Sequence, residues 1–599
     1  MRSKLSVCPF TVIDVLELLL AALVLGPGVA HAQQAGNPAC PGEEVFYNPG
    51  NGEDIVLPEG YRVEMFARDL NFPTGIAFQR AKGSFRVLVL QSGTGLPGAC
   101  NNNEAPVFGG KFSPRNPFTP DVVIFDRAGN RIAGGLFKPT PNGSGFQPDG
   151  PAIDLAFENG FQGGRLFASD SNQGVRGAPG QGNNTSRLVT LDPGFDRLNV
   201  FINRLPTGDH PTEQIAFRGG FIYWSQGSAT NSGVTGLDNG AGGNQHDIPC
   251  QDVVLSDNVW ASLSEGELRM TSGFSFHGVT RPGNTVAAFE SAFEGLHACT
   301  GAILRARIDA PDPAATIEPF SWGYRNPFGI RFSPANHPLN GRLFVTENGE
   351  DERGARPTNN APDRLQVAEQ NPDGTPDFHG WPDAFGFLDS TQAIFNPIGG
   401  PGDDLPPALV TTLDVPVQHV LAFPPQAPKQ PLAIEPTDVA TVGLDFAPDS
   451  FIHGVVKQGA ALVAREGDFG FSPANGEPKE GHDIQLVNFS MQGQPLQISL
   501  SRFAFNCPQA AQAHGPDGAA RCEDPTIKQA FVSQLRGINR PITAMFGPDG
   551  ALYLVDYGAV RDFGQSDPAT RFVDEPGFPS NGPLVQIPGT GTIWKICRQ

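Results

Sequence analysis

A pair of short apolar segments recurs six times along the chain, and this repeat limits the possible folds more than any other feature. The first segment of each pair ends at a phenylalanine, and the second ends in polar residues or glycine. The first segments end at Phe78, Phe157, Phe217, Phe332, Phe446 and Phe546. The second segments are 86–93, 164–171, 220–228, 341–349, 460–467 and 551–558. The runs are short and lack a sustained helical period, so each pair predicts a β-hairpin.

The spacing between the six copies is irregular, which disfavours a solenoid. It is typical of a six-bladed β-propeller whose blades share an inner hairpin and differ in their loops. We therefore expect an all-β fold with one propeller domain over 33–599, in which 96–150 and 390–435 are long loop insertions. The 73 glycines and 57 prolines suit many short strands joined by turns. The alternative is one large β-sandwich, or two, with hairpins that match by chance.

The first 32 residues read as a signal peptide. Arg2 and Lys4 supply the positive start, 18–25 is apolar, and Ala30-His31-Ala32 forms a small-x-small cleavage site. The apolar run is shorter than the ~20 residues that a membrane-spanning helix requires. We expect an exported protein, periplasmic or secreted, with no stable membrane insertion.

Cysteines and net charge narrow the chemistry. An oxidising compartment favours disulfides, and proximity in sequence suggests Cys250–Cys299 and Cys507–Cys522. An odd number of cysteines follows residue 32, so at least one remains over or is shared between chains. The formal net charge of −21 makes nucleic acid an unsuitable partner. An anion would need a local cluster of cations.

Polar and charged residues, which are costly to bury, stand where the hairpins begin or end. Arg325 and Asn326 precede the fourth hairpin, Arg540 precedes the sixth, and His210 precedes the third. Inner strands of a propeller line a central channel, so these residues are expected to meet at one mouth. Two arginines in equivalent places favour an anion site over two solvated charges. A histidine there can serve as a base, although an isolated loop histidine is the ordinary interpretation.

The acidic, glycine-containing stretch ENGEDERG (347–354) suits a hard cation such as Ca²⁺. It lacks the spacing of an EF-hand, and a solvated acidic loop is the alternative.

Several stretches resemble the soluble pyrroloquinoline quinone (PQQ)-dependent glucose/sorbosone dehydrogenase family of six-bladed propellers, in particular its sorbosone-dehydrogenase-like branch. The most specific stretches are GYRNPFGIRFSP (323–334) and FVTENGEDERG (344–354) with HGWPD (379–383). More general matches are 57–78, 208–228 and 538–558.

The resemblance implies a role for individual residues. His210 matches the catalytic base that takes the hydroxyl proton while hydride passes to the quinone. Arg325 and Asn326 match the pair that holds the quinone oxygens, and Arg540 matches an arginine that binds cofactor carboxylates. Gly349 and Glu350 match the residues whose backbone carbonyls bind Ca²⁺.

Three positions depart from the family pattern. A second cofactor-binding arginine is replaced by Ile542, and an aspartate after the third hairpin is replaced by Ser228. A lysine of the fifth blade has no clear counterpart, and Arg465 is the nearby residue that could stand in for it.

Three functions follow as hypotheses. The first is a quinoprotein oxidoreductase that oxidises an aldose or related aldehyde and passes electrons to a separate acceptor, because no haem-attachment motif occurs. The second is a Ca²⁺-dependent lactone hydrolase similar to the gluconolactonase family. The third is a propeller that binds a ligand without catalysis, which the missing cationic positions favour.

Overall fold

In the computed structural model of the chain, eighteen stretches are described: 33–40, 44–93, 100–101, 106–110, 113–136, 150–171, 184–236, 246–264, 267–290, 297–350, 355–356, 361–384, 418–436, 439–467, 481–490, 496–507, 536–562 and 584–599. This part is built almost entirely from strands, and among these residues the only helical pieces are short 3₁₀ turns such as Pro106–Phe108. No helix in these stretches is long and apolar enough to cross a membrane. The expected signal peptide, residues 1–32, lies outside the described residues.

Six sheets form the blades, and each begins with one of the six hairpins expected from the sequence. Neighbouring strands in them pair antiparallel, except that the last two strands of the third sheet pair parallel. The first two sheets have four strands each in simple sequence order. Blade one contains β5 (Pro73–Ala81), β6 (Ser84–Gln91), β7 (Asp121–Phe125) and β8 (Arg131–Leu136). Blade two contains β9 (Ala152–Phe157), β10 (Leu166–Asp170), β11 (Asn184–Leu191) and β12 (Leu198–Pro206).

The third and fourth sheets take in strands from farther along the chain. Blade three contains β13 (Thr212–Arg218), β14 (Phe221–Gln226), β19 (Ala302–Arg307), β20 (Glu318–Trp322) and β24 (Asp377–Phe378). Blade four contains β21 (Ile330–Phe332), β22 (Leu343–Glu347), β23 (Arg364–Ala368) and β25 (Ala433–Ile434).

The last two sheets use strands from the start of the chain. Blade five contains β26 (Thr441–Phe446), β27 (Ala461–Arg465), β28 (Asp483–Ser490), β29 (Gln497–Asn506) and the early strand β3 (Ile55–Val56). Blade six contains β30 (Pro541–Phe546), β31 (Leu552–Asp556), β34 (Gly591–Arg598) and β4 (Tyr61–Leu70).

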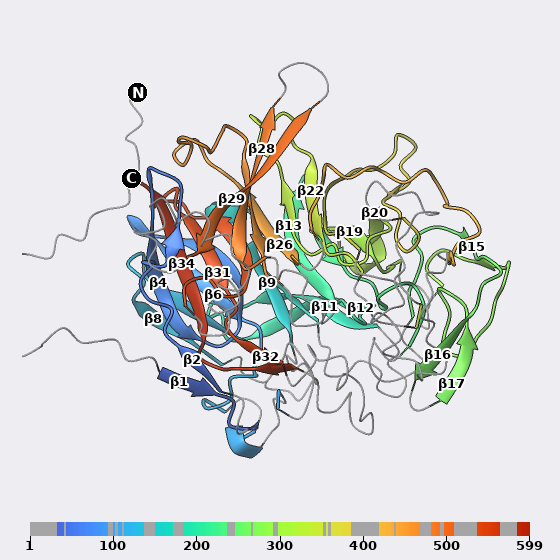
Figure 1. Ribbon diagram of the computed structural model, residues 1–599, viewed down its shortest axis with the longest axis horizontal. Coiled ribbons are helices and arrows are strands. Elements are labelled where there is room, and N and C mark those ends of the chain that lie inside the picture. Colours follow the sequence, from blue (N-terminus) through green and yellow to red (C-terminus); the bar gives the residue numbers. More distant parts are fainter. Residues whose placement is uncertain are drawn as a thin grey trace, which may run out of the picture.

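The ring closes where the two ends of the chain meet. β4 pairs antiparallel with β34, and Figure 1 shows the blue and red strands side by side. The inner strand β30 also contacts β5, so the first and last blades are neighbours. Pairing of this kind covers two sheet edges that would otherwise present unpaired backbone groups.

The apolar core lies between neighbouring blades. One cluster joins Leu88 and Leu90 of blade one to Leu155 and Phe157 of blade two. Because each blade is covered on both faces, its second strand reads as a short continuous apolar run, and all five residues of β31 are buried.

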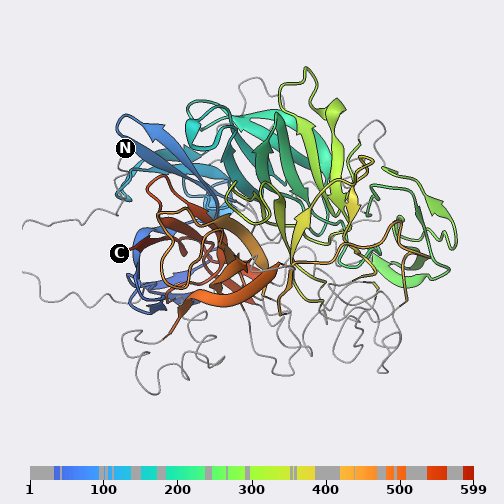
Figure 2. The same ribbon diagram turned by 90° about the horizontal axis from the view of Figure 1, so that it is seen from above.

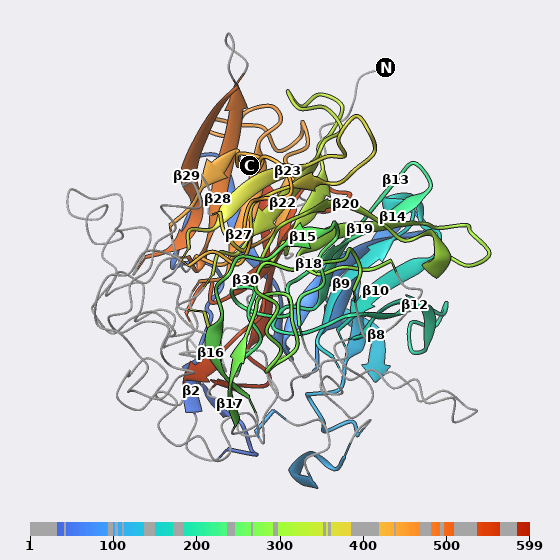
Figure 3. The same cartoon turned by 90° about the vertical axis from the view of Figure 1, so that its right-hand side faces the viewer.

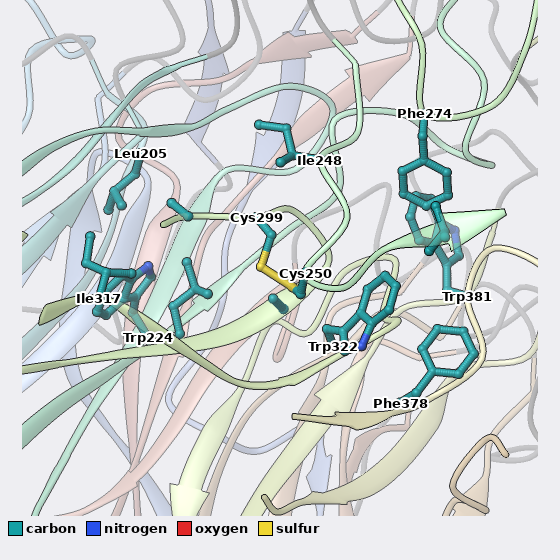
Figure 4. Close-up of a cluster of buried hydrophobic side chains, with 14 of the residues drawn as sticks. Leu205, Trp224, Ile248, Cys250, Phe274, Cys299, Ile317, Trp322, Phe378 and Trp381 are labelled. Carbon is teal, nitrogen blue, oxygen red and sulfur yellow. A yellow bond between two sulfur atoms is a disulfide. The ribbon is translucent and has the colours of Figure 1, made fainter. Parts of the chain in front are cut away.

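A long excursion of the chain, residues 227–301, separates β14 from β19. Its described part contains the ribbons β15 (Val253–Val254)–β18 (Thr285–Val286) and β16 (Trp260–Ser264)–β17 (Glu267–Thr271). Figures 1 and 2 show β16 and β17 at the end farthest from β4, and Figure 3 shows them from that end. The apolar side chains of this blade-three insertion, among them Phe274 and the Cys250–Cys299 disulfide, share one buried cluster with Trp224 of β14 and with Trp381 (Figure 4).

The expectations about the two long loop insertions need correction. The segment 96–150 is not purely an insertion, because it supplies β7 and β8, the outer half of blade one. Most of 390–435 lies outside the described residues, but its end supplies β25.

The Cys250–Cys299 disulfide is confirmed, whereas Cys40–Cys100 was not anticipated. Cys522, the partner expected for Cys507, lies outside the described residues.

Two further two-stranded ribbons complete the described strands. They are β1 (Gln33–Gly36)–β2 (Glu44–Tyr47) and β32 (Val560–Asp562)–β33 (Leu584–Gln586).

Candidate active site

One mouth of the central channel collects the residues that precede the inner strands and follow the second strands. Antiparallel pairing places the start of each inner strand beside the end of its partner. Thr212 pairs with Gln226, Thr441 with Arg465, and Pro541 with Asp556. The chain segments that carry His210, Arg325 and Arg540 therefore enter the ring at the same side.

His210, Asp209 and Arg325 form a contiguous charged group. The Nε2 atom of His210 lies 3.2 Å from Oδ2 of Asp209, and that oxygen lies 3.6 Å from Nη2 of Arg325. The side chains are 18%, 10% and 2% exposed, so only the histidine retains appreciable access to solvent. Asp209 was missed in the sequence, although its position next to His210 was the available signal.

Local hydrogen bonds fix Arg325 and Asn326. The backbone N–H of Arg325 donates to Oε1 of Glu347 at 2.8 Å, and its Nη1 donates to the carbonyl of Gly349. The amide of Asn326 donates to Oδ1 of Asn348 at 2.9 Å. Because the residue before a proline is restricted to extended backbone, Pro327 also keeps Asn326 out of a helical turn. These contacts tie the entry of blade four to the end of β22.

Gly349 and Glu350, the predicted Ca²⁺ residues, follow Asn348 just after the end of β22. The N–H of Gly349 donates to Asp363 at 2.9 Å, and a Cβ at this glycine would lie 2.0 Å from the carbonyl oxygen of Ala361. The carbonyl of Glu350 accepts from the N–H of Ala361 at 2.7 Å. Among the described residues, each of the two carbonyls accepts one hydrogen bond, and a carbonyl oxygen has two acceptor positions.

The side chain of Glu350 is buried, and neither carboxylate oxygen has a hydrogen-bond partner among the residues that the structure describes. Burial raises the pKa of Glu350 to about 8, against the opposing charges of Arg356 and Arg325. A buried carboxylate without a donor is costly unless a cation or proton satisfies it. The oxygen atoms at 349–350 therefore suit a hard divalent ion. Within the described residues, no three His, Cys, Asp or Glu side chains form a metal-binding group.

Arg540 is linked to Arg325 through two buried carboxyls. Burial raises the pKa of Glu466 to about 7, with Arg540 acting against the rise and Asp556 adding to it. Burial likewise raises the pKa of Glu213 well above its usual range, with Arg325 opposing and Glu466 adding to the effect. Arg540 thus acts on Glu466 and Arg325 acts on Glu213, so the positive charge of each arginine is partly balanced by a buried protein carboxyl.

Arg465 lies in a different environment from the one predicted for a cofactor ligand. Its guanidinium donates to both carboxylate oxygens of Asp483 at 2.7 Å and to Glu435 at 3.3 Å. This buried ion-pair cluster joins blade five to Glu435, which directly follows β25 of blade four. Arg465 as a substitute for the missing lysine stays a prediction, and these two carboxylates compete with any such role.

The structure also describes the two other positions that depart from the family pattern. Ile542 is buried in β30, two residues after Arg540. Ser228 is fully buried, and its hydroxyl donates to the carbonyl of Thr230 at 2.6 Å. Neither side chain adds charge to the mouth.

Comparisons with known proteins add similarity of fold at low identity. No family model matches the sequence, and neither does any curated protein. A calcium structure of a Trichoderma reesei carbohydrate-active enzyme of family AA12 is 15% identical, with a TM-score of 0.45 over 93% of this chain and 98% of that one. A Thermus thermophilus oxidoreductase described as a glucose dehydrogenase is 15% identical, with a TM-score of 0.38 over 90% and 100%.

A third similar structure is described as a gluconolactonase. It is 10% identical, with a TM-score of 0.33 over 92% of this chain and 96% of that one. A structure described as an oxidoreductase and one described as a gluconolactonase thus both match this chain, and TM-scores below 0.5 do not separate them. The assignment of function depends on the residues at the mouth.

Proposed function

We propose that the protein is an exported oxidoreductase that oxidises an aldose or related aldehyde with PQQ and Ca²⁺. The observation that carries the proposal is the contact of His210, Asp209 and Arg325 at the channel mouth. A base beside a buried cation is the arrangement required to remove a hydroxyl proton while negative charge is stabilised nearby. The two disulfides support export.

His210 would act as the base. The Asp209 carboxylate lies beside Nε2 and favours a proton on that nitrogen, which leaves Nδ1 to accept the proton of the substrate hydroxyl. When bound, the quinone supplies the hydride acceptor, and Ca²⁺ makes that acceptor more electrophilic. General-base catalysis of this kind contributes ~10²–10⁴-fold to the rate.

The residues available to hold the cofactors follow from their contacts. Gly349 and Glu350 would provide oxygen ligands for Ca²⁺, including the Glu350 carboxylate, which has no hydrogen-bond partner in the described part of the chain. Arg325, Asn326 and Arg540 would bind the oxygens of the quinone. Electrons would leave to a separate acceptor.

Cofactor binding provides the first test. Purified protein is titrated with PQQ in the presence and absence of Ca²⁺, and binding is followed by the absorption of the quinone. Reduction of a dye is then measured with a panel of sugars and aldehydes. Quinone binding that requires Ca²⁺, followed by sugar-dependent dye reduction, is the expected result.

Substitution of the base provides the second test. His210→Ala should bind the quinone and lose ~10²–10⁴-fold in turnover. His453→Ala is the matched control, because His453 is exposed and follows the other end of the inner strand β26. Equal turnover in the two variants would rule out His210 as the base.

The lactone hydrolase remains a separate outcome of the same preparation. Hydrolysis of a sugar lactone with Ca²⁺ alone, and no quinone binding, would replace the proposed oxidoreductase with the hydrolase. Tight quinone binding without turnover of any sugar would favour the non-catalytic propeller.

A further inference from the structure

The turn after β14 contacts both the segment that carries Asp209 and His210 and the segment that carries Arg325. The backbone N–H of His210 donates to the carbonyl of Ser228 at 2.9 Å, and that of Asp209 donates to Ala229 at 3.0 Å. On its other side, the N–H of Ser228 donates to the carbonyl of Arg325 at 2.8 Å. The Ser228–Thr230 turn therefore sets the spacing between the proposed base and its neighbouring cation.

The segment that carries His210 and the Ser228–Thr230 turn pack too closely to move toward each other. A Cβ added at Gly227 would lie 2.2 Å from Cβ of His210, and one at Gly208 would lie 2.3 Å from Cα of Ala229. Such distances are far below van der Waals contact, so displacement of the turn must displace His210.

Asp247 holds the Ser228–Thr230 turn from the blade-three insertion. Its Oδ1 accepts from the N–H of Ala229 at 2.7 Å, and its Oδ2 accepts from the hydroxyl of Thr230 at 2.5 Å. Oδ1 also accepts from the hydroxyl of Thr300 at 2.9 Å. Asp247 is 1% exposed, so these hydrogen bonds are shielded from water.

The base of the insertion keeps Asp247 and Thr300 together. Thr300 follows Cys299, and Asp247 precedes Cys250 by three residues, in the disulfide shown in Figure 4. Ile248 donates its N–H to the hydroxyl of Thr300 at 2.9 Å and accepts from the N–H of Thr300 at 3.0 Å. Asp247, Ile248 and Thr300 thus form one hydrogen-bonded group, which contacts the Ser228–Thr230 turn.

We infer that Asp247 is a positioning residue, which fixes His210 relative to Arg325 through the Ser228–Thr230 turn. Its catalytic meaning rests on the proposed function, whereas its effect on His210 is measurable without substrate. The blade-three insertion then supports the site as well as enlarging the molecule.

The test uses the full chain with Asp247→Ala, Asp247→Asn and Thr300→Val. The reactivity of His210 toward diethyl pyrocarbonate is measured against pH by mass spectrometry of the peptide that contains it. Asp549→Ala is the matched control, because Asp549 is also buried and accepts hydrogen bonds in the turn between β30 and β31, at the opposite end of the channel.

Asp247→Ala should change the modification rate of His210 by at least ~3-fold and shift the pH at which it is half-maximal, because the donors on the turn lose their shared acceptor. Asp247→Asn retains an acceptor oxygen and should restore most of the wild-type profile. Thr300→Val removes one of the three hydrogen bonds that Asp247 accepts, so it should shift the His210 profile in the same direction but by less. This variant also tests the inference if Asp247→Ala fails to fold.

Folded Asp247→Ala or Thr300→Val protein with the His210 profile of the wild type and of Asp549→Ala would overturn the inference. In protein with dehydrogenase activity, turnover of Asp247→Ala should also fall, by up to ~10²-fold. Absence of any dehydrogenase activity in the wild type would refute the proposed function alone, because the His210 profile would still test the role of Asp247.

Discussion

Replacement of Glu466 by Gln should stabilise the protein at alkaline pH. Glu466 is 7% exposed, and its folded-state pKa of about 7 lies above the unfolded value of about 4.5. The native state therefore binds its proton more tightly than the unfolded state. The stability linked to this group is fully present below pH 4.5 and is lost as pH rises toward and through 7.

The magnitude follows from the two pKa values. At 1.36 kcal/mol per pKa unit, the titration of Glu466 lowers the unfolding free energy, relative to its value at acid pH, by about 3 kcal/mol at pH 8 and by less than about 1 kcal/mol at pH 5. Glu466→Gln removes this cost. The difference in unfolding free energy between variant and wild type should therefore shift by about 2–3 kcal/mol toward the variant between pH 5 and pH 8.

Urea unfolding followed by tryptophan fluorescence measures this difference at each pH. Glu318→Gln is the control, because Glu318 is 46% exposed beside Arg305 and should change stability by less than about 0.5 kcal/mol at either pH. Equal shifts at pH 5 and pH 8 for Glu466→Gln would refute the reasoning. The same substitution should strengthen quinone binding at pH 8, since one carboxylate beside Arg540 is removed.

Three further substitutions separate the charged groups of the mouth. Arg540→Ala should weaken PQQ binding by ~10–100-fold in an absorption titration, because it removes a buried cation; unchanged affinity would exclude the residue from the cofactor site. Arg465→Ala should lower the unfolding free energy by about 3–5 kcal/mol in urea, since Asp483 and Glu435 lose their counter-charge; a stable variant with lost quinone binding would instead support its role as a cofactor ligand. Gly227→Ala should reduce dye-linked turnover by up to ~10²-fold through displacement of His210, and normal turnover would contradict the close packing of the two loops.

Local patterns in the chain were enough to predict the propeller and the ends of its inner strands. Each hairpin is a local feature, because its apolar run and terminal turn residues are adjacent in the chain. The six inner strands therefore coincide with the segments that end at Phe78, Phe157, Phe217, Phe332, Phe446 and Phe546. The same locality placed His210, Arg325 and Arg540 at the starts of strands.

Which charges meet depends on the packed fold. Arg465, the last residue of β27, pairs with Asp483 inside blade five, whereas its neighbour Glu466, just beyond the strand, acts on Arg540. Sequence proximity cannot distinguish those two outcomes.

The same limit applies to contacts between distant segments. The closure of the ring by β4 and β34 and the support of the Ser228–Thr230 turn by Asp247 each join parts of the chain that no local pattern connects. Residue types and strand positions were readable from the sequence because they depend on local spacing, whereas side-chain partners depend on how the closed ring packs.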